Sequence, residues 1–385
     1  MRYRYSAGEN GKLIKKAIIY TSDEHGIDPA DVEGEAVSII RKLKSAGFDA
    51  YIVGGAVRDL ILGKRPKDFD IVTTASPAKI KKLFRNSRII GRRFRLVHVF
   101  FGQRIFEVST FRSLKDGYTG NTFGSIDEDV FRRDFTMNAL FYDPEQQIVV
   151  DYVGGIKDIK KRLVKPVIPV TEIFTEDPVR MIRAVKYAAL TGFSIPLNLK
   201  IRIARQSNLL QTISPSRLTE EILKIIHSDH ASAIVNMLEK TGLYCYLQPK
   251  AASLMKKDTS FRQNYLRSMA GLKGNEIRHG HALGALVNDY LETIGEWKPG
   301  VIENYNEIFH AARSFVLPMN PPRTELGYAV KKFLAARQIT IKRPHLPVKP
   351  KPEAGETASA KVKKRRRRSS GKKANKKQTT DSGVI

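Results

Sequence analysis

The chain of 385 residues has a single cysteine, Cys245, so it cannot form a disulfide within itself. This is typical of proteins of the reducing cytoplasm, where we expect this one to be located. No run of about 18 apolar residues occurs, which excludes a membrane-spanning helix, and residues 1–16 lack the apolar core of a secretory signal. The pattern Gly-x-x-x-x-Gly-Lys-Ser/Thr is also missing, which excludes a P-loop ATPase. Apolar and aromatic residues flank Cys245, which predicts a core thiol rather than a nucleophile.

Acidic residues are scarce relative to basic ones. The 67 Lys and Arg outnumber the 39 Asp and Glu, for a net charge of +28, while 42% hydrophobic residues are typical of a folded protein. Residues 341–385 hold 15 Lys and Arg against three carboxylates, a local net charge of +12. Their densest run is Lys363, Lys364, Arg365, Arg366, Arg367 and Arg368. We interpret this segment as a disordered cationic arm that binds a polyanion, most simply RNA; the alternative is a tail that only aids solubility.

The remaining pattern predicts a mixed α/β head followed by a helical body. Strands are expected at 48–53, 69–72, 95–101 and 104–111, and helices at 34–46, 56–62 and 77–84. After about residue 153 the pattern is mostly helical, with periodic segments near 177–191, 216–227, 231–240 and 324–336. The expected divisions are a loosely ordered N-terminal extension 1–33, the head 34–155, a helical neck 156–228, a helical body 229–340 and the basic tail 341–385.

Two glycines and two aspartates form the first candidate site. Gly54 and Gly55 separate a predicted strand from a helix, so backbone amides can approach a phosphate there, and Arg58 can add a charged contact. Asp68 and Asp70 are two positions apart on a predicted strand, so both carboxylates face the same side. Such charges repel unless a cation lies between them, and one or two Mg²⁺ ions shared with substrate phosphates fit this role. The alternative is a glycine turn followed by a solvated acidic strand end.

A second cluster lies in the segment from Arg132 to Leu140. On a helix, Asp134 and Asn138 share a face, with Arg133 beside them. Such a cluster could hold a ribose hydroxyl and a phosphate together. A surface network of ion pairs explains the same residues equally well.

A third cluster begins a predicted helix near residue 177. Asp177, Arg180 and Arg183 lie on one stripe of that helix, so an acceptor stands beside donors. The amino group and ring nitrogen of adenine or cytosine complement this order, whereas guanine and uracil present the reverse. The alternative is that acidic residues and Pro178 only cap the helix.

These three clusters, in this order, resemble the motifs of the class II nucleotidyltransferases, the family of CCA-adding tRNA nucleotidyltransferases and bacterial poly(A) polymerases. The resemblance covers about residues 35–240. It implies a polymerase-β-like head in which Asp68 and Asp70 bind metal ions, followed by helical neck and body domains. The residues that it implies in nucleotide contact are Gly55, Arg58, Arg133, Arg180 and Arg183, with Asp177 and Arg180 selecting the base. Residues 151–155 resemble the flexible hinge after the head. For the third acidic group, the family pattern favours Asp134, and Glu107 on the strand 104–111 is the alternative.

The stretch from Ile89 to Val99 resembles the segment that distinguishes bacterial poly(A) polymerases from their CCA-adding relatives. Its Arg92, Arg93 and Arg95 are expected to bind RNA together with the tail, although an ordinary strand hairpin with a cationic rim is the alternative. The implied activity is a Mg²⁺-dependent adenylyltransferase, with Mn²⁺ as a substitute, that adds AMP from ATP to RNA 3′ ends without a template. The runs of AMP added in this way promote RNA turnover, so RNA-decay proteins are expected partners. The rival functions are CCA addition and a non-catalytic RNA-binding scaffold.

Overall fold

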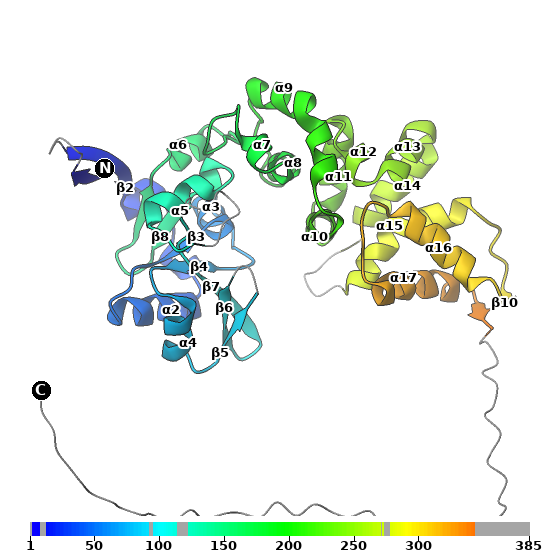
Figure 1. Ribbon diagram of the computed structural model, residues 1–385, viewed down its shortest axis with the longest axis horizontal. Coiled ribbons are helices and arrows are strands. Elements are labelled where there is room, and N and C mark those ends of the chain that lie inside the picture. The colour runs from blue at the N-terminus through cyan, green and yellow to red at the C-terminus, as the bar shows by residue number, and fades with distance from the viewer. Residues whose placement is uncertain are drawn as a thin grey trace, which may run out of the picture. The chain divides into compact units, whose positions relative to one another are not determined.

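The computed structural model describes residues 2–7, 13–91, 95–113, 122–270, 272 and 278–342 (Figure 1). Within it, Met1–Lys342 form one unit. Of the predicted disordered tail 341–385, residues Arg343–Ile385 lie outside the described residues, whereas Ile341 belongs to a short strand. Nine strands form one mixed sheet in the order β1-β2-β9-β8-β3-β4-β7-β6-β5. Their bounds are β1 Arg2–Ala7, β2 Leu13–Tyr20, β3 Ala50–Val53, β4 Asp70–Thr73, β5 Ser87–Ile90, β6 Leu96–Phe101, β7 Arg104–Thr110, β8 Leu140–Asp143 and β9 Ile148–Asp151. The expected α/β head is confirmed.

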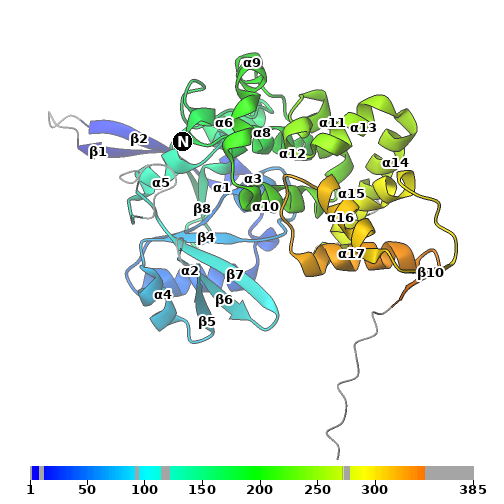
Figure 2. The same ribbon diagram turned by 45° about the vertical axis from the view of Figure 1, so that its right-hand side comes forward.

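Helices cover both faces of this sheet. The helices of the head are α1 Ser22–His25, α2 Gly34–Ser45, α3 Gly55–Ile61, α4 Pro77–Leu83, α5 Ile126–Arg132 and α6 Gly155–Lys160. Buried apolar side chains of α2 and α4 belong to one core cluster with Ile71 and Val108 of the sheet, and side chains of α5 belong to a second cluster with Val53 and Val72. The two clusters lie on opposite faces because neighbouring strand residues alternate in direction. Figure 2 shows α2 and α4 beside strands β5–β7.

The rest of the described chain is almost entirely helical, as the sequence predicts. Its helices are α7 Ile173–Glu176, α8 Val179–Thr191, α9 Leu197–Gln206, α10 Pro215–Ile226, α11 Ala231–Lys240, α12 Tyr244–Leu247, α13 Pro249–Lys257, α14 Thr259–Ala270, α15 His279–Thr293, α16 Tyr305–Phe315 and α17 Arg323–Ala335 (green to orange in Figure 1). Two three-residue strands, β10 Gly300–Ile302 and β11 Ile339–Ile341, form a small parallel pair that the sequence pattern did not predict. The segments are too short to show a period.

Two local predictions are wrong. The N-terminal residues are not a loose extension, because β2 pairs with β9 inside the large sheet and β1 pairs with β2. The reason is tertiary: the partner of β2 lies more than a hundred residues away in the sequence. Cys245 is exposed rather than buried, because α12 turns Tyr244 and Leu247 inward and leaves the thiol on its outer side. Among the described residues, no helix is both long and apolar enough to cross a membrane.

The turn between β9 and α6 is fixed by one carboxylate. Asp151 is 1% exposed, and its oxygens accept hydrogen bonds from the backbone amides of Val153, Gly154, Gly155 and Ile156 at 2.8–3.1 Å. Gly155 also permits a close approach, since a Cβ there would lie 2.2 Å from the carbonyl oxygen of Thr136. The segment that resembles a hinge is therefore tied down at its start, and α6 packs directly on the segment that carries the second cluster.

Replacing Asp151 with Ala should destabilise the protein by about 2 kcal/mol or more, because four helix-start amides lose their acceptor at once. Urea unfolding of the variant measures this free energy. The matched control is Asp28→Ala, since Asp28 is exposed and accepts one amide hydrogen bond, from Ala30. That change should cost about 1 kcal/mol or less; equal losses in the two variants would contradict the assigned role of Asp151.

Candidate active site

The two predicted metal ligands lie at the start of β4. The strand begins at Asp70, and Asp68 lies in the loop before it; both residues are reached by solvent. Asp70 is directly opposite Val53 in β3, so its side chain lies on the sheet face of the second apolar cluster. The sequence analysis assigned both aspartates to the strand, whereas only Asp70 belongs to it.

A further carboxylate lies beside Asp70 on β7. The parallel pairing of Ile71 with Val108 brings Glu107 into register with Asp70, and a carboxylate oxygen of Glu107 lies 3.3 Å from Nε2 of His98 in β6. Burial of the carboxyl group, followed by the negative charge of Glu107, raises the pKa of Asp70 to about 6. Asp68 acts in the same direction, and Arg133 opposes it. Negative charge is therefore crowded at the start of β4.

This crowding suits a divalent cation. The described residues contain no group of three or more His, Cys, Asp or Glu side chains placed to enclose a metal ion by themselves. Mg²⁺ commonly takes one or two protein carboxylates and completes its shell with waters and substrate phosphates. The carboxylates of Asp68 and Asp70 fit this requirement, because a positive ion beside them would offset both the burial and the neighbouring negative charges that raise the pKa of Asp70.

The glycine pair forms the turn from β3 into α3. Gly54 has a φ of +72° and a ψ of −132°, a backbone conformation that residues other than glycine rarely adopt. Gly54 and Gly55 line the same cavity as Asp70. Arg58 does not line it: its guanidinium is buried, bonds to Asp59, and donates a hydrogen bond of 2.9 Å to the side-chain oxygen of Asn138. The expected contact between Arg58 and nucleotide stays a prediction. In the structure, the guanidinium of Arg58 contacts Asp59 and Asn138.

The predicted helix across the second cluster is wrong, although the predicted contact is present. Helix α5 ends at Arg132, and the chain continues extended into a single 3₁₀ turn, η2 Thr136–Asn138. The amide of Thr136 and the carbonyl of Asp134 bond to Lys165 and Val167, which takes the place of continuous helical hydrogen bonds, and only the 3₁₀ turn bonds within the segment. Asn138 nevertheless donates a side-chain hydrogen bond of 3.2 Å to Asp134. A long-range backbone partner thus decided the local conformation.

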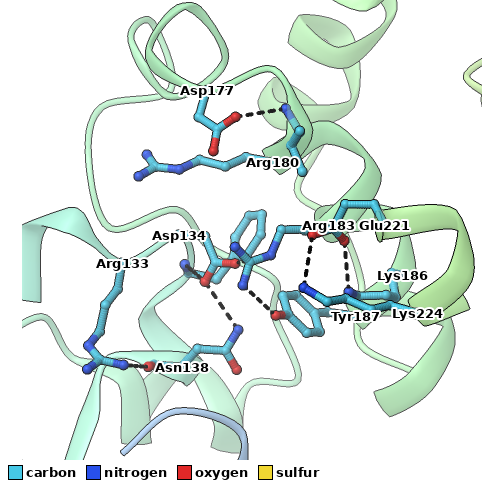
Figure 3. Close-up of polar contacts among 12 residues, drawn as sticks. Arg133, Asp134, Asn138, Asp177, Arg180, Arg183, Lys186, Tyr187, Glu221 and Lys224 are labelled. Carbon is cyan, nitrogen blue, oxygen red and sulfur yellow. Dashed lines mark hydrogen bonds and ion pairs between the residues drawn. The ribbon is translucent and has the colours of Figure 1, made fainter. Parts of the chain in front are cut away.

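Asp134 is buried and has protein partners at both of its carboxylate oxygens. Its carboxylate forms an ion pair with Arg183 at 3.0 Å and accepts hydrogen bonds from Asn138 and the amide of Phe135 (Figure 3). Burial disfavours its charge, but Arg183 and these hydrogen bonds prevail and hold the pKa of Asp134 below its usual value. Asp134 therefore fixes Arg183 across the junction of head and helices. Glu107, rather than Asp134, is the carboxylate next to Asp70.

The base-selecting pair of the third cluster lies at the start of α8. Asp177 precedes the helix and accepts a hydrogen bond from the amide of Val179 at 3.1 Å. Arg180 donates a hydrogen bond of 2.9 Å to the carbonyl oxygen of Arg132 at the end of α5. Figure 3 shows the side chains of Asp177 and Arg180 side by side above Asp134. An acceptor and a donor therefore stand together, as the sequence predicts.

These elements enclose one cavity of about 440 Å³. Its lining includes all the predicted nucleotide-binding residues except Arg58, and all the predicted catalytic carboxylates except Asp68. The lining residues are Gly54, Gly55, Asp70, Ser109, Arg112, Asp129, Arg132, Arg133, Asp134, Asn138, Asp177, Arg180, Arg183, Tyr187 and Arg217. Six arginines against four aspartates give the wall a surplus of positive charge, which suits a triphosphate.

Sequence reasoning missed several of these lining residues. Asp129 forms an ion pair with Arg133 at 2.8 Å, and Arg217 forms one with Asp177 at 2.5 Å. Tyr187 accepts a hydrogen bond of 3.0 Å from Arg183. The only signal for Tyr187 was its helical spacing from Arg183, four residues earlier. Arg217 carried no signal, because its partner lies on another helix.

The predicted RNA-binding residues are only partly described. Arg95 is exposed just before β6. Arg92, Arg93 and the tail run at 363–368 lie outside the described residues.

Comparison with known proteins adds independent information. A family described as "Poly A polymerase head domain" matches residues 50–165, and one described as "Probable RNA and SrmB- binding site of polymerase A" matches residues 192–255. Poly(A) polymerase I of Escherichia coli O6:H1 is 40% identical over 260 residues, which cover 63% of this chain and 56% of that protein. The CCA-adding enzyme of Geobacillus kaustophilus is 37% identical over 241 residues, covering 60% of this chain and 59% of that protein. The chain thus spans little more than half the length of these curated relatives.

The fold is also found among solved structures. The crystal structure of the Bacillus stearothermophilus CCA-adding enzyme in complex with CTP matches with a TM-score of 0.55 at 27% identity, covering 78% of this chain and 82% of that one. The two family matches, the named relatives and the ordered motifs around one cavity agree: over these residues the chain is similar to poly(A) polymerases and CCA-adding enzymes, the class II nucleotidyltransferases.

Proposed function

We propose that this chain is a template-independent polynucleotide adenylyltransferase that adds AMP from ATP to RNA 3′ ends. The observation that carries the proposal is a single cavity lined both by Asp70 at the start of β4 and by the acceptor–donor pair of Asp177 and Arg180 at the start of α8. The identity of 40% with proteins named poly(A) polymerase I supports the adenylyl branch. The resemblance of residues 89–99 to that branch points the same way.

In the proposed reaction, the 3′-hydroxyl of RNA loses its proton to solvent, and its oxygen forms a bond to the α-phosphorus of ATP. The bond from that phosphorus to the oxygen bridging to the β-phosphate breaks, and pyrophosphate leaves with the electron pair. Asp177 accepts from the adenine amino group while Arg180 donates to the ring nitrogen, which orients the base. Arg133 and the amides after Gly54 bind the triphosphate, and Asn138, oriented by Arg58, faces the ribose. Catalysis then depends on positioning and charge stabilisation.

Asp68 and Asp70 are the residues proposed to hold Mg²⁺, with Mn²⁺ as a substitute. The ions, when bound, supply positive charge that neutralises the triphosphate and makes the 3′-hydroxyl more acidic. We favour Glu107 as the third acidic group, because it lies in register with Asp70. Asp134, the alternative from the family pattern, is already bonded to Arg183 and is proposed to act by positioning that arginine.

The surface around α4 and β5 supports RNA as the polymer. Residues 71–106 contain nine Lys and Arg and no Asp or Glu. Within the described part of this stretch, Lys82, Arg85, Arg88 and Arg95 are exposed. Strand β5 is at the edge of the sheet, three positions from β4. At ordinary strand spacing, RNA bound along β5 therefore lies about 14 Å from the strand that carries Asp70. A cytoplasmic location and RNA-decay partners stay predictions.

CCA addition is the second candidate function, because CCA-adding enzymes are among the relatives at 37% identity and adenine and cytosine present the same order of groups. Labelled ATP or CTP, offered with an oligo(A) primer or with a tRNA lacking its 3′ end, separates the two. We expect long A tails on the primer. A single CCA triplet on the tRNA would establish the alternative, and no incorporation would leave the RNA-binding scaffold.

Replacing Asp70 with Asn should lower AMP incorporation by about 10³-fold, because the cavity loses the charge proposed to hold the cation. Incorporation of labelled ATP measures this, and circular dichroism checks the fold. The matched control is Asp49→Asn, since Asp49 is an exposed carboxylate beside the neighbouring strand and does not line the cavity. Near-normal turnover of the Asp70 variant would remove the metal role.

Deleting residues 345–385 should weaken RNA binding and flatten its dependence on salt. The shortened chain contacts fewer phosphates, so fewer counterions are released when it binds RNA. Affinity for a single-stranded RNA at several salt concentrations measures the slope. A full-length variant with serine at the six positions 363–368 is the control for chain length. It should behave in part like the deletion; unchanged slopes in both would refute the cationic arm.

A further inference from the structure

We propose that the exposed basic side chains at the end of α6 bind the phosphate backbone of RNA, upstream of the 3′ end that reacts (Figure 1). This α6 surface consists of Lys157, Lys160, Lys161, Arg162 and Lys165. None of these residues lines the cavity that is proposed to bind the nucleotide. The inference rests on the proposed function, because it takes RNA as the polymer.

The α6 surface carries positive charge that the chain itself does not neutralise. Residues 152–171 contain five Lys and Arg and a single acidic residue, Asp158. All five basic residues are exposed, whereas Asp158 is 5% exposed. Lys165 lies 4.0 Å from a carboxylate oxygen of Asp158, and within the described part of the chain the other four form no ion pair. A negatively charged partner therefore has no carboxylate to displace from them.

The local structure gathers three of these lysines around one cavity. Lys157 and Lys161 are four residues apart at the end of α6, so their side chains share a face of the helix. Arg162, directly after them, has a φ of +54°, a left-handed conformation that residues with a Cβ adopt at some cost. The chain turns there, and Lys165 lines the same cavity of about 420 Å³ as Lys157 and Lys161. Such a cavity suits an anionic group such as a phosphate.

A single segment of chain separates the α6 surface from the nucleotide cavity. Asp158, which lies beneath the lysines of α6, accepts a hydrogen bond of 2.8 Å from the hydroxyl of Thr136 in η2. Asp134 and Asn138, two residues to either side of Thr136, line the nucleotide cavity. The α6 surface therefore lies next to the cavity in which the RNA 3′ end is proposed to react.

The composition of the α6 surface favours phosphates over an apolar partner. Among residues 152–171, which are all described, no large apolar side chain is exposed. Protein interfaces depend on buried aromatic or aliphatic anchors, and helices that bind a membrane surface need an apolar face. Lysine contacts with phosphates need neither and read no base sequence. These properties suit the backbone of RNA that continues out of the nucleotide cavity.

The test is RNA binding by the full chain, measured without ATP. In the variant Lys157→Gln/Lys161→Gln/Lys165→Gln, the affinity for a long single-stranded oligo(A) at low salt should fall about tenfold, because three exposed ionic contacts are lost. The slope of log affinity against log salt should become shallower by about 2, since each contact with a single-stranded phosphate contributes about 0.7. Replacing the same three lysines with Arg keeps the charge and should preserve both affinity and slope.

A second variant controls for the loss of positive charge in general. Lys16→Gln/Lys298→Gln/Lys342→Gln removes three exposed lysines, each of which forms an ion pair with a carboxylate of the chain. This control changes the net charge by the same amount as the first glutamine variant. Because its lysines already have partners, it should keep the salt slope of the unmodified protein.

Incorporation of labelled ATP separates the RNA backbone from free phosphate groups as the occupant. If the α6 surface binds RNA, its glutamine variant should raise KM for the primer and leave KM for ATP unchanged. A raised KM for ATP with unchanged RNA affinity would assign the surface to free nucleotides and overturn the proposal. An unchanged salt slope, or equal changes in the variant and its control, would also overturn it. Loss of RNA affinity as expected, in a protein that incorporates no ATP even when unmodified, would instead refute the proposed function alone.

Discussion

Pairing of opposite charges across the cavity is the interaction on which the rest of the site depends. Arg133 bonds to Asp129, Arg183 to Asp134, and Arg217 to Asp177. An unpaired charge removed from water is strongly destabilising, so these partners must reach one another when the chain folds. Arg183 thereby joins α8 to the stretch that precedes η2, and Arg217 joins α10 to the start of α8. The same bonds hold arginine donors in place for a nucleotide before it arrives, which lowers the cost of ordering them on binding.

At the start of β4, by contrast, charges of the same sign lie close together. Within the described strands of the large sheet, β4 and β7 form the one parallel pair, and their register brings Glu107 beside Asp70. Here like charges meet, and burial of the carboxyl group together with the charge of Glu107 raises the pKa of Asp70. A paired cationic wall facing a crowded anionic edge suits an occupant with both signs, such as a triphosphate with its cations. In the proposed function, the nucleotide is bound at the cationic wall and the reacting group is activated at the start of β4.

Much of the fold was predictable where the signal is local. Helix α2, the Ser76–Pro77 start of α4 and the hairpin of β6 and β7 follow from periodicity, capping and turn residues, and the structure confirms them. Predictions failed where a distant segment decided the outcome. Strand β2 depends on β9, and the stretch after Arg132 bonds to residues 165–167 instead of forming a helix. Backbone groups take whichever partners the tertiary structure offers, so a sequence window cannot assign them.

The sequence alone determined which chemistry is available: paired aspartates, a glycine turn, an acceptor beside donors and a large excess of positive charge. Those features depend on residue types and on spacings of a few residues. They can therefore be read from the sequence before the fold is known. Only the tertiary structure decided which groups meet. It brought Glu107 to Asp70 through strand register, turned Arg58 toward Asn138, and supplied Arg217 to Asp177 from another helix. Such contacts depend on where separate elements pack, and packing is a property of the whole chain.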